Sequence, residues 1–124
     1  IRDRIIRITE LDVRHTYEPT ANPSAEQLMK QADVYRWIIE SYKENVPATQ
    51  QSGFTIWSLS DHADEHTGWF TGDTPNLFDA NYARKPAYKG VCDGIAGRDI
   101  SEDFTGDDWK AAYEVKEEET PADQ

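Results

Sequence analysis

The sequence has one cysteine, Cys92, so no disulfide bond can form within the chain. Cys92 falls among the apolar positions of an expected helix, which predicts a small buried side chain rather than a reactive thiol. Long apolar runs are also missing, and no stretch approaches the roughly 18 residues that a membrane-spanning helix needs. The sequence therefore does not suggest a disulfide-stapled scaffold or a membrane-spanning helix.

Basic residues are scarce. The chain has 13 Lys and Arg against 24 Asp and Glu, a formal net charge of −11. An acidic surface is not attracted to phosphates or acidic lipids, so nucleic acids and anionic membranes are not expected partners. The charge is uneven, because residues 97–124 hold ten acids and three bases. We expect two parts: a folded segment over 1–97 and an acidic, partly disordered tail over 98–124, in which Phe104, Trp109 and Tyr113 could anchor a short helix.

The remaining pattern alternates between strand and helix. Residues 4–13 and 53–59 are apolar and predict strands, and residues 15–23 and 60–76 predict loops. Between the strands, Ser24 and Gln27 form a capping-box pattern that starts a helix, and Pro47 ends it near Asn45. Its apolar stripe comprises Leu28, Ala32, Tyr35, Ile39, Tyr42 and Val46. A last helix begins at Pro86 and ends by Gly97. This order predicts a βαβ unit with parallel strands.

Each predicted strand ends in acidic residues. Alternate residues of a strand share a face, so Glu10 and Asp12 are expected on the face of Ile6 and Ile8. Leu11 and Val13 are then expected on the opposite face. Asp61 ends the second strand in the same manner, and it is expected to anchor loop backbone. An acid at the carboxyl end of a barrel strand is typical of a catalytic residue.

Four short motifs identify a family. Residues 8–12 read ITELD, 53–57 read GFTIW, 77–82 read LFDANY and 85–88 read KPAY. In this order, residues from about 4 to 96 resemble the last quarter of the glycoside hydrolase family 10 barrel, the fold of retaining endo-β-1,4-xylanases. The resemblance implies an α/β fold, namely the last two βα units of a (β/α)8 TIM barrel. A whole barrel needs about 250 residues, so 124 residues imply part of a domain.

The resemblance also implies roles for individual residues. Glu10 matches the nucleophile, and Asp12 matches an aspartate that orients a histidine bonded to that nucleophile. Trp57 matches a tryptophan that lines the subsite of bond cleavage, although a tryptophan within a strand also suits core packing. Trp69 is expected to line the cleft, but its loop is longer than in the family and Phe70 replaces a basic residue.

No cofactor or metal is expected. His62 and His66 are four residues apart, a spacing that suits zinc only on a helix, and this stretch reads as a loop without an HExxH motif. His15 lies just past the first strand, where it could contact substrate or remain a solvated loop residue. In the family, the acid/base glutamate lies on an upstream strand that these residues do not include. The isolated chain is therefore expected to be inactive.

The expected partners are xylan or a related β-1,4-linked polysaccharide, together with the missing barrel segment or a second copy of the chain. The family resemblance places the protein outside the cell or in the periplasm. Two alternatives stay open. One is a non-catalytic carbohydrate-binding or structural remnant of the barrel, and the other is an acidic interaction module that acts through residues 98–124.

Overall fold

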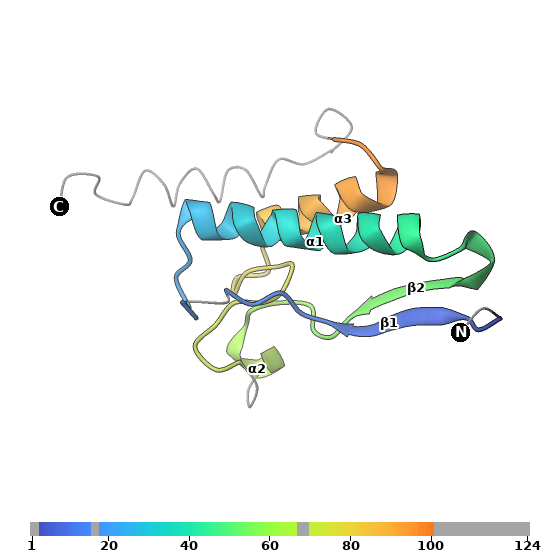
Figure 1. Cartoon of the computed structure of the whole chain (residues 1–124). Helices are drawn as coiled ribbons and strands as arrows, with labels where there is room; N and C mark the ends of the chain where they lie inside the picture. The colour runs from blue at the N-terminus through green and yellow to red at the C-terminus, as the bar shows by residue number, and fades with distance from the viewer. Residues whose placement is uncertain (1–2, 16–17, 67–69, 101–124) are drawn as a thin grey trace.

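The structure, a computed structural model, describes residues 3–15, 18–66 and 70–100. In chain order the elements are β1 (Ile6–Leu11), α1 (Ala25–Asn45), a 3₁₀ turn (Ala48–Gln50), β2 (Gln51–Ile56), α2 (Ala63–His66) and α3 (Pro86–Ala96) (Figure 1). The acidic tail predicted for residues 98–124 lies outside the described residues from position 101 onward. Its suggested anchors, Phe104, Trp109 and Tyr113, therefore lie outside them as well.

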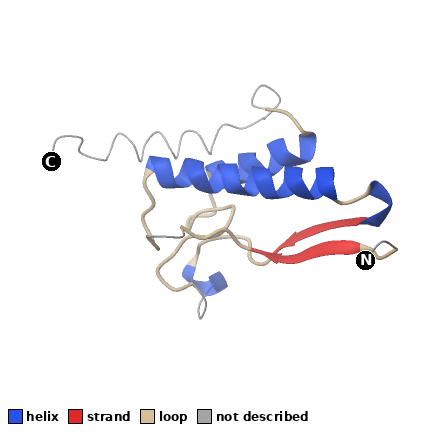
Figure 2. Cartoon of the chain, in the orientation of Figure 1, coloured by secondary structure: helices blue, strands red, loops and turns tan. Residues whose placement is uncertain are grey.

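The two strands form a parallel sheet, and α1 connects them, which confirms the predicted βαβ unit. Figure 2 shows both long helices on one side of this sheet. No described helix covers the opposite face, where Arg7 and Thr9 of β1 are exposed next to Thr55 of β2. A guanidinium nitrogen of Arg7 donates to the Thr55 hydroxyl over 2.9 Å. One face of the sheet is thus apolar and covered by helices, and the other is polar.

Helix α1 begins and ends where its sequence predicts. The Ser24 hydroxyl accepts from Gln27 N at 3.2 Å, and the Gln27 side chain accepts from Ser24 N at 2.8 Å, which completes the capping box. The predicted stripe faces the sheet; its buried members are Leu28, Ala32, Tyr35, Ile39 and Tyr42. Val46 is only half-buried, because the helix has already ended at Asn45.

Helix α3 packs closely on α1. Pro86 occupies its first turn, and Gly97 ends it with a left-handed backbone at φ 72°. A Cβ added at Gly90 would lie 2.3 Å from the Ala32 carbonyl oxygen, so glycine permits this helix approach. Cys92 is half-buried rather than fully buried, and burial raises the pKa of its thiol, as expected for an unreactive cysteine.

One apolar core joins the sheet to the helices. Its buried members are Leu11, Val13, Tyr35, Ile39, Leu77, Ala87 and Val91, and Ile8, Phe54 and Ile56 pack against them. The second strand differs from its prediction, since it spans Gln51–Ile56 rather than 53–59. Trp57 N still donates to Leu11 O of β1, but beyond Trp57 the chain leaves β1, and Ser60 forms a bridge with Phe78. Among the described residues, no helix has the length and apolar character to cross a membrane.

Candidate active site

Glu10 lies near the carboxyl end of β1 with its side chain exposed to solvent. The predicted alternation is wrong here, because the pairing register shifts between Ile8 and Leu11. Ile8 pairs with Phe54 and Leu11 with Ile56, so β1 uses one more residue than β2 over this stretch. Ile8 and Leu11 therefore both reach the helix-covered core, whereas Glu10 lies outside it. The irregularity separates the carboxylate from the apolar residues with which it was expected to share a face.

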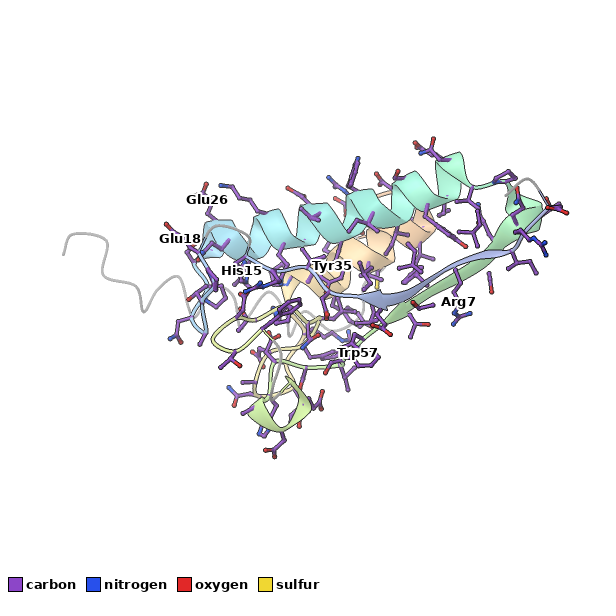
Figure 3. The ribbon with its side chains drawn as sticks, turned by 60° about the horizontal axis from the view of Figure 1, so that its bottom comes forward. Arg7, His15, Glu18, Glu26, Tyr35 and Trp57 are labelled. Atoms are coloured by element: carbon purple, nitrogen blue, oxygen red, sulfur yellow. The ribbon has the colours of Figure 1, made fainter. Side chains whose placement is uncertain are left out.

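Trp57 follows β2 directly and lies beside the residue after Glu10. Its backbone N–H donates to the Leu11 carbonyl oxygen over 3.3 Å. Trp57 is 51% exposed, and its role in lining the subsite stays a prediction. In Figure 3 it lies on the side of the strands away from α1. Glu10 and Trp57 thus come from the carboxyl ends of two paired strands, where a carboxylate and an indole face can meet one ligand.

Asp12 follows β1 and is half-buried. Burial raises the pKa of the Tyr35 phenol well above its ordinary range, and the negative charge of Asp12 raises it further. Asp12 thus lies close enough to α1 to act electrostatically on that helix. The histidine-orienting role that the family resemblance implies for Asp12 stays a prediction.

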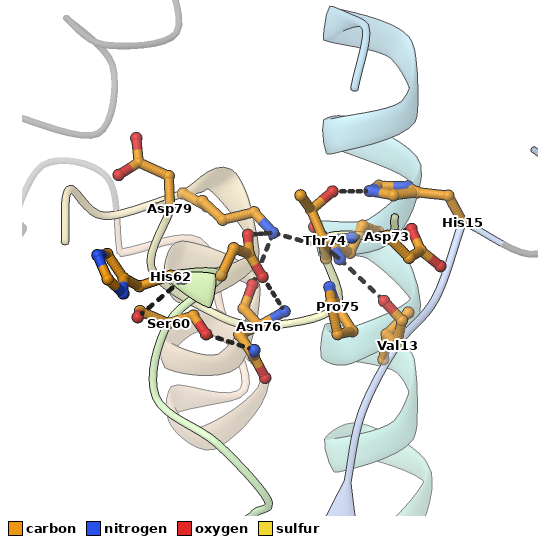
Figure 4. Close-up of polar contacts among 12 residues, drawn as sticks. Val13, His15, Ser60, His62, Asp73, Thr74, Pro75, Asn76 and Asp79 are labelled. Carbon is orange, nitrogen blue, oxygen red and sulfur yellow. Dashed lines mark hydrogen bonds and ion pairs between the residues drawn. The ribbon is translucent and has the colours of Figure 1, made fainter. Parts of the chain in front are cut away.

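A four-residue segment, residues 73–76, connects the two strand ends, and we refer to it as the strand-end bridge (Figure 4). All four residues are buried, although the loop that contains them reads as polar. Its carbonyl groups accept hydrogen bonds from α1: Gln31 donates to Thr74 O at 2.8 Å and Tyr35 donates to Pro75 O at 2.5 Å. Burial of this polar segment is possible because side chains from several elements bind its backbone.

Lys85 and Asp61 form a buried ion pair against the strand-end bridge. Lys85 Nζ lies 2.7 Å from Asp61 Oδ2, and the two side chains are 3% and 1% exposed. The ammonium also donates to the carbonyl oxygens of Thr74 and Asn76, each at 2.8 Å. Asp61 Oδ1 accepts from Asn76 N at 2.9 Å, which confirms that Asp61 anchors loop backbone.

His15 is buried and does not fit either prediction made for it, a substrate contact or a solvated loop residue. Its Nε2 lies 3.0 Å from the Thr74 hydroxyl oxygen. That hydroxyl donates its hydrogen to Thr20 O at 2.9 Å, so it accepts from His15 and the ring proton resides on Nε2. Burial lowers the pKa of His15 despite the opposing charge of Asp73, so the ring is neutral at neutral pH.

Helix α2 lies in the long loop after β2, on the side of the sheet opposite α1 and α3 (Figure 1). The Glu65 carboxylate accepts from Ser60 N at 2.8 Å, and this backbone bond is the main reason why the pKa of Glu65 is lowered. His62 precedes the helix and stacks on Tyr82, with ring centroids 5.5 Å apart. The loop is therefore tied to both the end of β2 and the turn before α3.

Two further site predictions concern this loop. Trp69 lies outside the described residues, so its position in the cleft stays a prediction. Among the residues that the structure describes, no group of three His, Cys, Asp or Glu side chains could hold a metal ion. His62 Nδ1 instead accepts a hydrogen bond from the backbone of Asp64 at 3.2 Å.

Sequence reasoning missed the roles of Lys85 and the strand-end bridge. Lysine is seldom buried, and a stretch with Asp73, Thr74 and Asn76 resembles a solvated loop. One signal was available: an acid at the end of a buried strand, Asp61, requires a basic partner. The KPAY motif contains that base, but one sequence does not show which lysine pairs with which acid.

Comparison with known proteins agrees with this architecture. The model of glycosyl hydrolase family 10 matches residues 3–94. Endo-1,4-beta-xylanase A of Cellvibrio japonicus is 34% identical over 106 residues, an alignment that covers 75% of this chain and 17% of that protein. An endo-1,4-beta-xylanase of Agaricus bisporus is 34% identical over 90 residues, an alignment that covers 72% of this chain and 25% of that protein. The chain thus spans a quarter or less of these relatives.

Solved structures show the same partial match. A thermostable mutant of the xylanase Xyn10A from Cellvibrio japonicus superimposes with a TM-score of 0.64 at 34% identity, covering 75% of this chain and 31% of that one. A mutant of xylanase 10C from the same organism, in complex with xylopentaose, gives a TM-score of 0.66 at 26% identity. The superposition covers 76% of this chain and 22% of that one. The family model spans 92 of 124 residues, from 3 to 94, so the chain belongs to glycosyl hydrolase family 10, as its motifs predicted.

Proposed function

We propose that this chain is the C-terminal part of a retaining endo-β-1,4-xylanase and contributes its nucleophile, Glu10. The observation that carries the proposal is the placement of Glu10 and Trp57 at the carboxyl ends of paired parallel strands, where both residues are exposed. Barrel enzymes carry out catalysis at the carboxyl ends of their strands. The xylanase relatives support xylan as the substrate.

In the proposed mechanism, the Glu10 carboxylate attacks the anomeric carbon and forms a covalent glycosyl-enzyme. A second carboxyl group protonates the departing oxygen, and then activates the water that releases the sugar. Trp57 would cover the apolar face of the sugar ring at the cleaved bond. Solvent exposure keeps Glu10 available to substrate, and its place in a paired strand fixes the direction of attack.

The second carboxyl group is proposed to come from outside these 124 residues. Retaining enzymes need the two carboxyl groups about 5–5.5 Å apart. Glu26, Glu40 and Glu44 belong to α1, which lies on the other side of the sheet from Trp57. Glu26 and Glu40 there form ion pairs with Lys30 and Arg36. We therefore propose that the isolated chain does not hydrolyse xylan.

The complementing partner is proposed to be the upstream part of a barrel. Each strand of the two-stranded sheet has only one strand neighbour among the described residues. A groove of about 760 Å³ lies between the segment after β1 and the first turns of α1, and its lining includes Val13 and Val34 with charged residues around them. Val34 is 42% exposed there. An apolar floor with a polar rim is typical of a surface covered by another polypeptide segment.

The location of the enzyme follows from its proposed substrate. Xylan is a polymer, so we propose that the enzyme acts outside the cell or in the periplasm. Detection of the mature protein with intact cells and with fractionated extracts checks this proposal. Its recovery in the cytoplasmic fraction alone would contradict it.

A fusion enzyme tests the proposed function. The segment of Cellvibrio japonicus xylanase A that aligns with this chain is replaced by the full 124-residue chain, so that the host supplies the rest of the barrel. The fusion should hydrolyse xylan, and Glu10→Gln should abolish hydrolysis while xylopentaose binding persists. In Glu10→Ala, added azide should restore turnover of an activated aryl xyloside and give a product of inverted configuration, because the small anion fills the vacated space.

Glu44→Gln is the matched control, because Glu44 is an exposed glutamate on α1. It should leave hydrolysis unchanged. Near-normal activity of Glu10→Gln would show that Glu10 is not the nucleophile. A folded fusion that binds xylopentaose without hydrolysing xylan would favour the carbohydrate-binding alternative. Hydrolysis of xylan by the isolated 124-residue chain would contradict the proposed need for a second chain segment.

A further inference from the structure

The strand-end bridge contacts the backbone that follows both proposed substrate-binding residues. On the β1 side, the Gln31 amide donates to Val13 O and Thr74 O, each at 2.8 Å, and Val13 N lies 3.5 Å from Pro75 O. On the β2 side, Asn76 Nδ2 donates to Ser60 O at 2.6 Å. Val13 is three residues beyond Glu10, and Ser60 is three residues beyond Trp57. The bridge therefore fixes how the two strand ends are placed relative to each other.

Lys85 binds the strand-end bridge at two of its carbonyl groups. Its ammonium binds Thr74 O and Asn76 O on either side of Pro75, and it binds Asp61 at the end of the Trp57 segment. These three acceptors equal the number of N–H donors that a lysine has. Lys85 is also the residue that precedes α3, and its backbone N–H donates to Leu77 O at 2.9 Å. The lysine is thus fixed at its backbone and at its tip.

The segment from Trp57 to Asp61 is fixed by hydrogen bonds along its length. Trp57 N is bound to Leu11 O beside Glu10, and Phe78 N binds Leu59 O at 3.3 Å. Leu59 itself is 56% exposed, so packing does little to fix the middle of the segment. Its far end is fixed by Asp61, which pairs with Lys85. Asp61 N is also bound to Phe78 O at 2.9 Å and Ser60 N to Glu65 at 2.8 Å, so loss of this pair would loosen the far end rather than release it, and we expect the indole to shift.

We infer that Lys85 is a positioning residue for catalysis: through Asp61 and the strand-end bridge, it holds Trp57 at the angle and distance from Glu10 that sugar binding requires. Lys85 is buried and lies behind the site, so it does not touch the substrate. The inference rests on the proposed function, and it assigns the buried pair a role in substrate binding in addition to its structural role.

A double-mutant cycle in the fusion enzyme tests the inference. kcat and KM for xylopentaose are measured for Lys85→Met, Trp57→Ala and the combined variant. Because small displacements of a binding group can cost up to about 100-fold in rate, Lys85→Met should lower kcat/KM by about 10–100-fold. In the Trp57→Ala background, Lys85→Met should lower it by less than about threefold, since the group that it positions is already gone. Losses that multiply would overturn the inference.

Two further variants separate positioning from loss of stability. Lys85→Met combined with Asp61→Asn removes both charges and keeps an acceptor for Asn76 N, so it preserves the fold if the single variant unfolds. It should show the same dependence on Trp57. Lys89→Met is the control, because Lys89 of α3 pairs with Asp93 of the same helix and with Asp99 beyond it, away from the bridge. Equal losses of kcat/KM in Lys89→Met and Lys85→Met would also overturn the inference.

The outcome for Glu10→Gln in the same fusion separates this inference from the proposed function. If Glu10→Gln stays active, the proposed function fails, and the double-mutant cycle of Lys85 and Trp57 then gives no information on positioning relative to a nucleophile. If Glu10→Gln is inactive while the effects of Lys85→Met and Trp57→Ala multiply, only the positioning role fails.

Discussion

At the amino ends of the strands, the hydroxyl of Tyr42 donates to Ile6 O at 2.6 Å and accepts from the backbone N–H groups of Ser52 and Gly53. At the carboxyl ends, the ammonium of Lys85 binds a carboxylate and two carbonyl oxygens. The first set is neutral and partly exposed, and the second is charged and buried. The end with the proposed site therefore depends on charges whose loss of hydration must be offset by one another, whereas the other end can recruit water.

Removing the buried cation should have the largest effect. Lys85→Met leaves Asp61 ionised and buried, a situation that typically costs about 3–5 kcal/mol of folding free energy. Urea unfolding of the fusion enzyme measures this loss. Lys30→Met is the control, because the Lys30–Glu26 pair is exposed and such pairs are typically worth about 0–1 kcal/mol. Equal losses in the two variants would show that burial of the pair does not matter.

The helix layer is common to both strand ends, and Gly90→Ala tests it. The added Cβ would lie 2.3 Å from a backbone oxygen of α1, so the two helices must separate. Overpacking of this kind typically costs about 1–3 kcal/mol. Gly94→Ala should cost less, because its Cβ would come no closer than 3.0 Å to Ile39 Cβ and 3.1 Å to the Arg36 carbonyl oxygen. Unfolding midpoints measure both losses, and a reversed order would contradict the close approach at Gly90.

Substitutions of two tyrosines of α1 allow the two strand ends to be compared, because Tyr35 bonds at the carboxyl ends and Tyr42 at the amino ends. Tyr35→Phe leaves the buried Pro75 carbonyl without its phenol donor, which should cost about 1–3 kcal/mol. Tyr42→Phe removes three hydrogen bonds, but their partners lie where water can reach them, so it should cost less. The measurement is the difference between the unfolding free energies of the two variants. A larger loss for Tyr42→Phe would remove the proposed contrast between the ends.

The smallest expected effect is a pH dependence at the carboxyl end. Burial holds the pKa of His15 below its ordinary value of 6.5, and the positive charge of Lys85 lowers it further. The negative charges of Asp73 and Asp61 raise this pKa but do not offset the effect of burial. At a pH above 6.5 both folded and unfolded states are neutral. As the pH falls below it, the unfolded chain binds a proton before the folded chain does, so stability decreases. His15→Gln keeps a donor for Thr74 and should show a smaller decrease between pH 7.5 and 5; an unchanged decrease would exclude His15 as its cause.

Much of the fold could be predicted from local patterns. The capping box at Ser24 and the apolar stripe of α1 depend on neighbouring residues, so the sequence contains all that is needed to place the helix. The order of the strands and their parallel pairing also followed from the spacing of elements. The extent of β2 could not be predicted, because Gly53 adopts φ +100° within it and because, beyond Trp57, the chain pairs with Phe78 rather than with β1.

The candidate site could be predicted only in part. Motif resemblance pointed to Glu10 and Trp57, and the structure exposes both. The ion pair between Lys85 and Asp61 spans 24 positions, and the bridge that it holds combines contacts from α1, from the residue before α3 and from the segments that follow both strands. Such contacts depend on the complete tertiary arrangement. Hydropathy alone assigns lysine, aspartate and asparagine to the surface, so it has no means of finding a buried polar network.

The extra residue of β1 between Ile8 and Leu11 has a consequence for how this family can vary. Side chains alternate along a strand, so deleting one residue from this stretch would exchange the inward and outward positions that follow. Glu10 is exposed because of the number of residues between Ile8 and Leu11, and a substitution at a neighbouring position does not change that number. Divergence by replacement is therefore tolerated here far better than divergence by insertion or deletion. In this respect the exposure of Glu10 depends on the number of residues in β1 rather than on particular side-chain contacts.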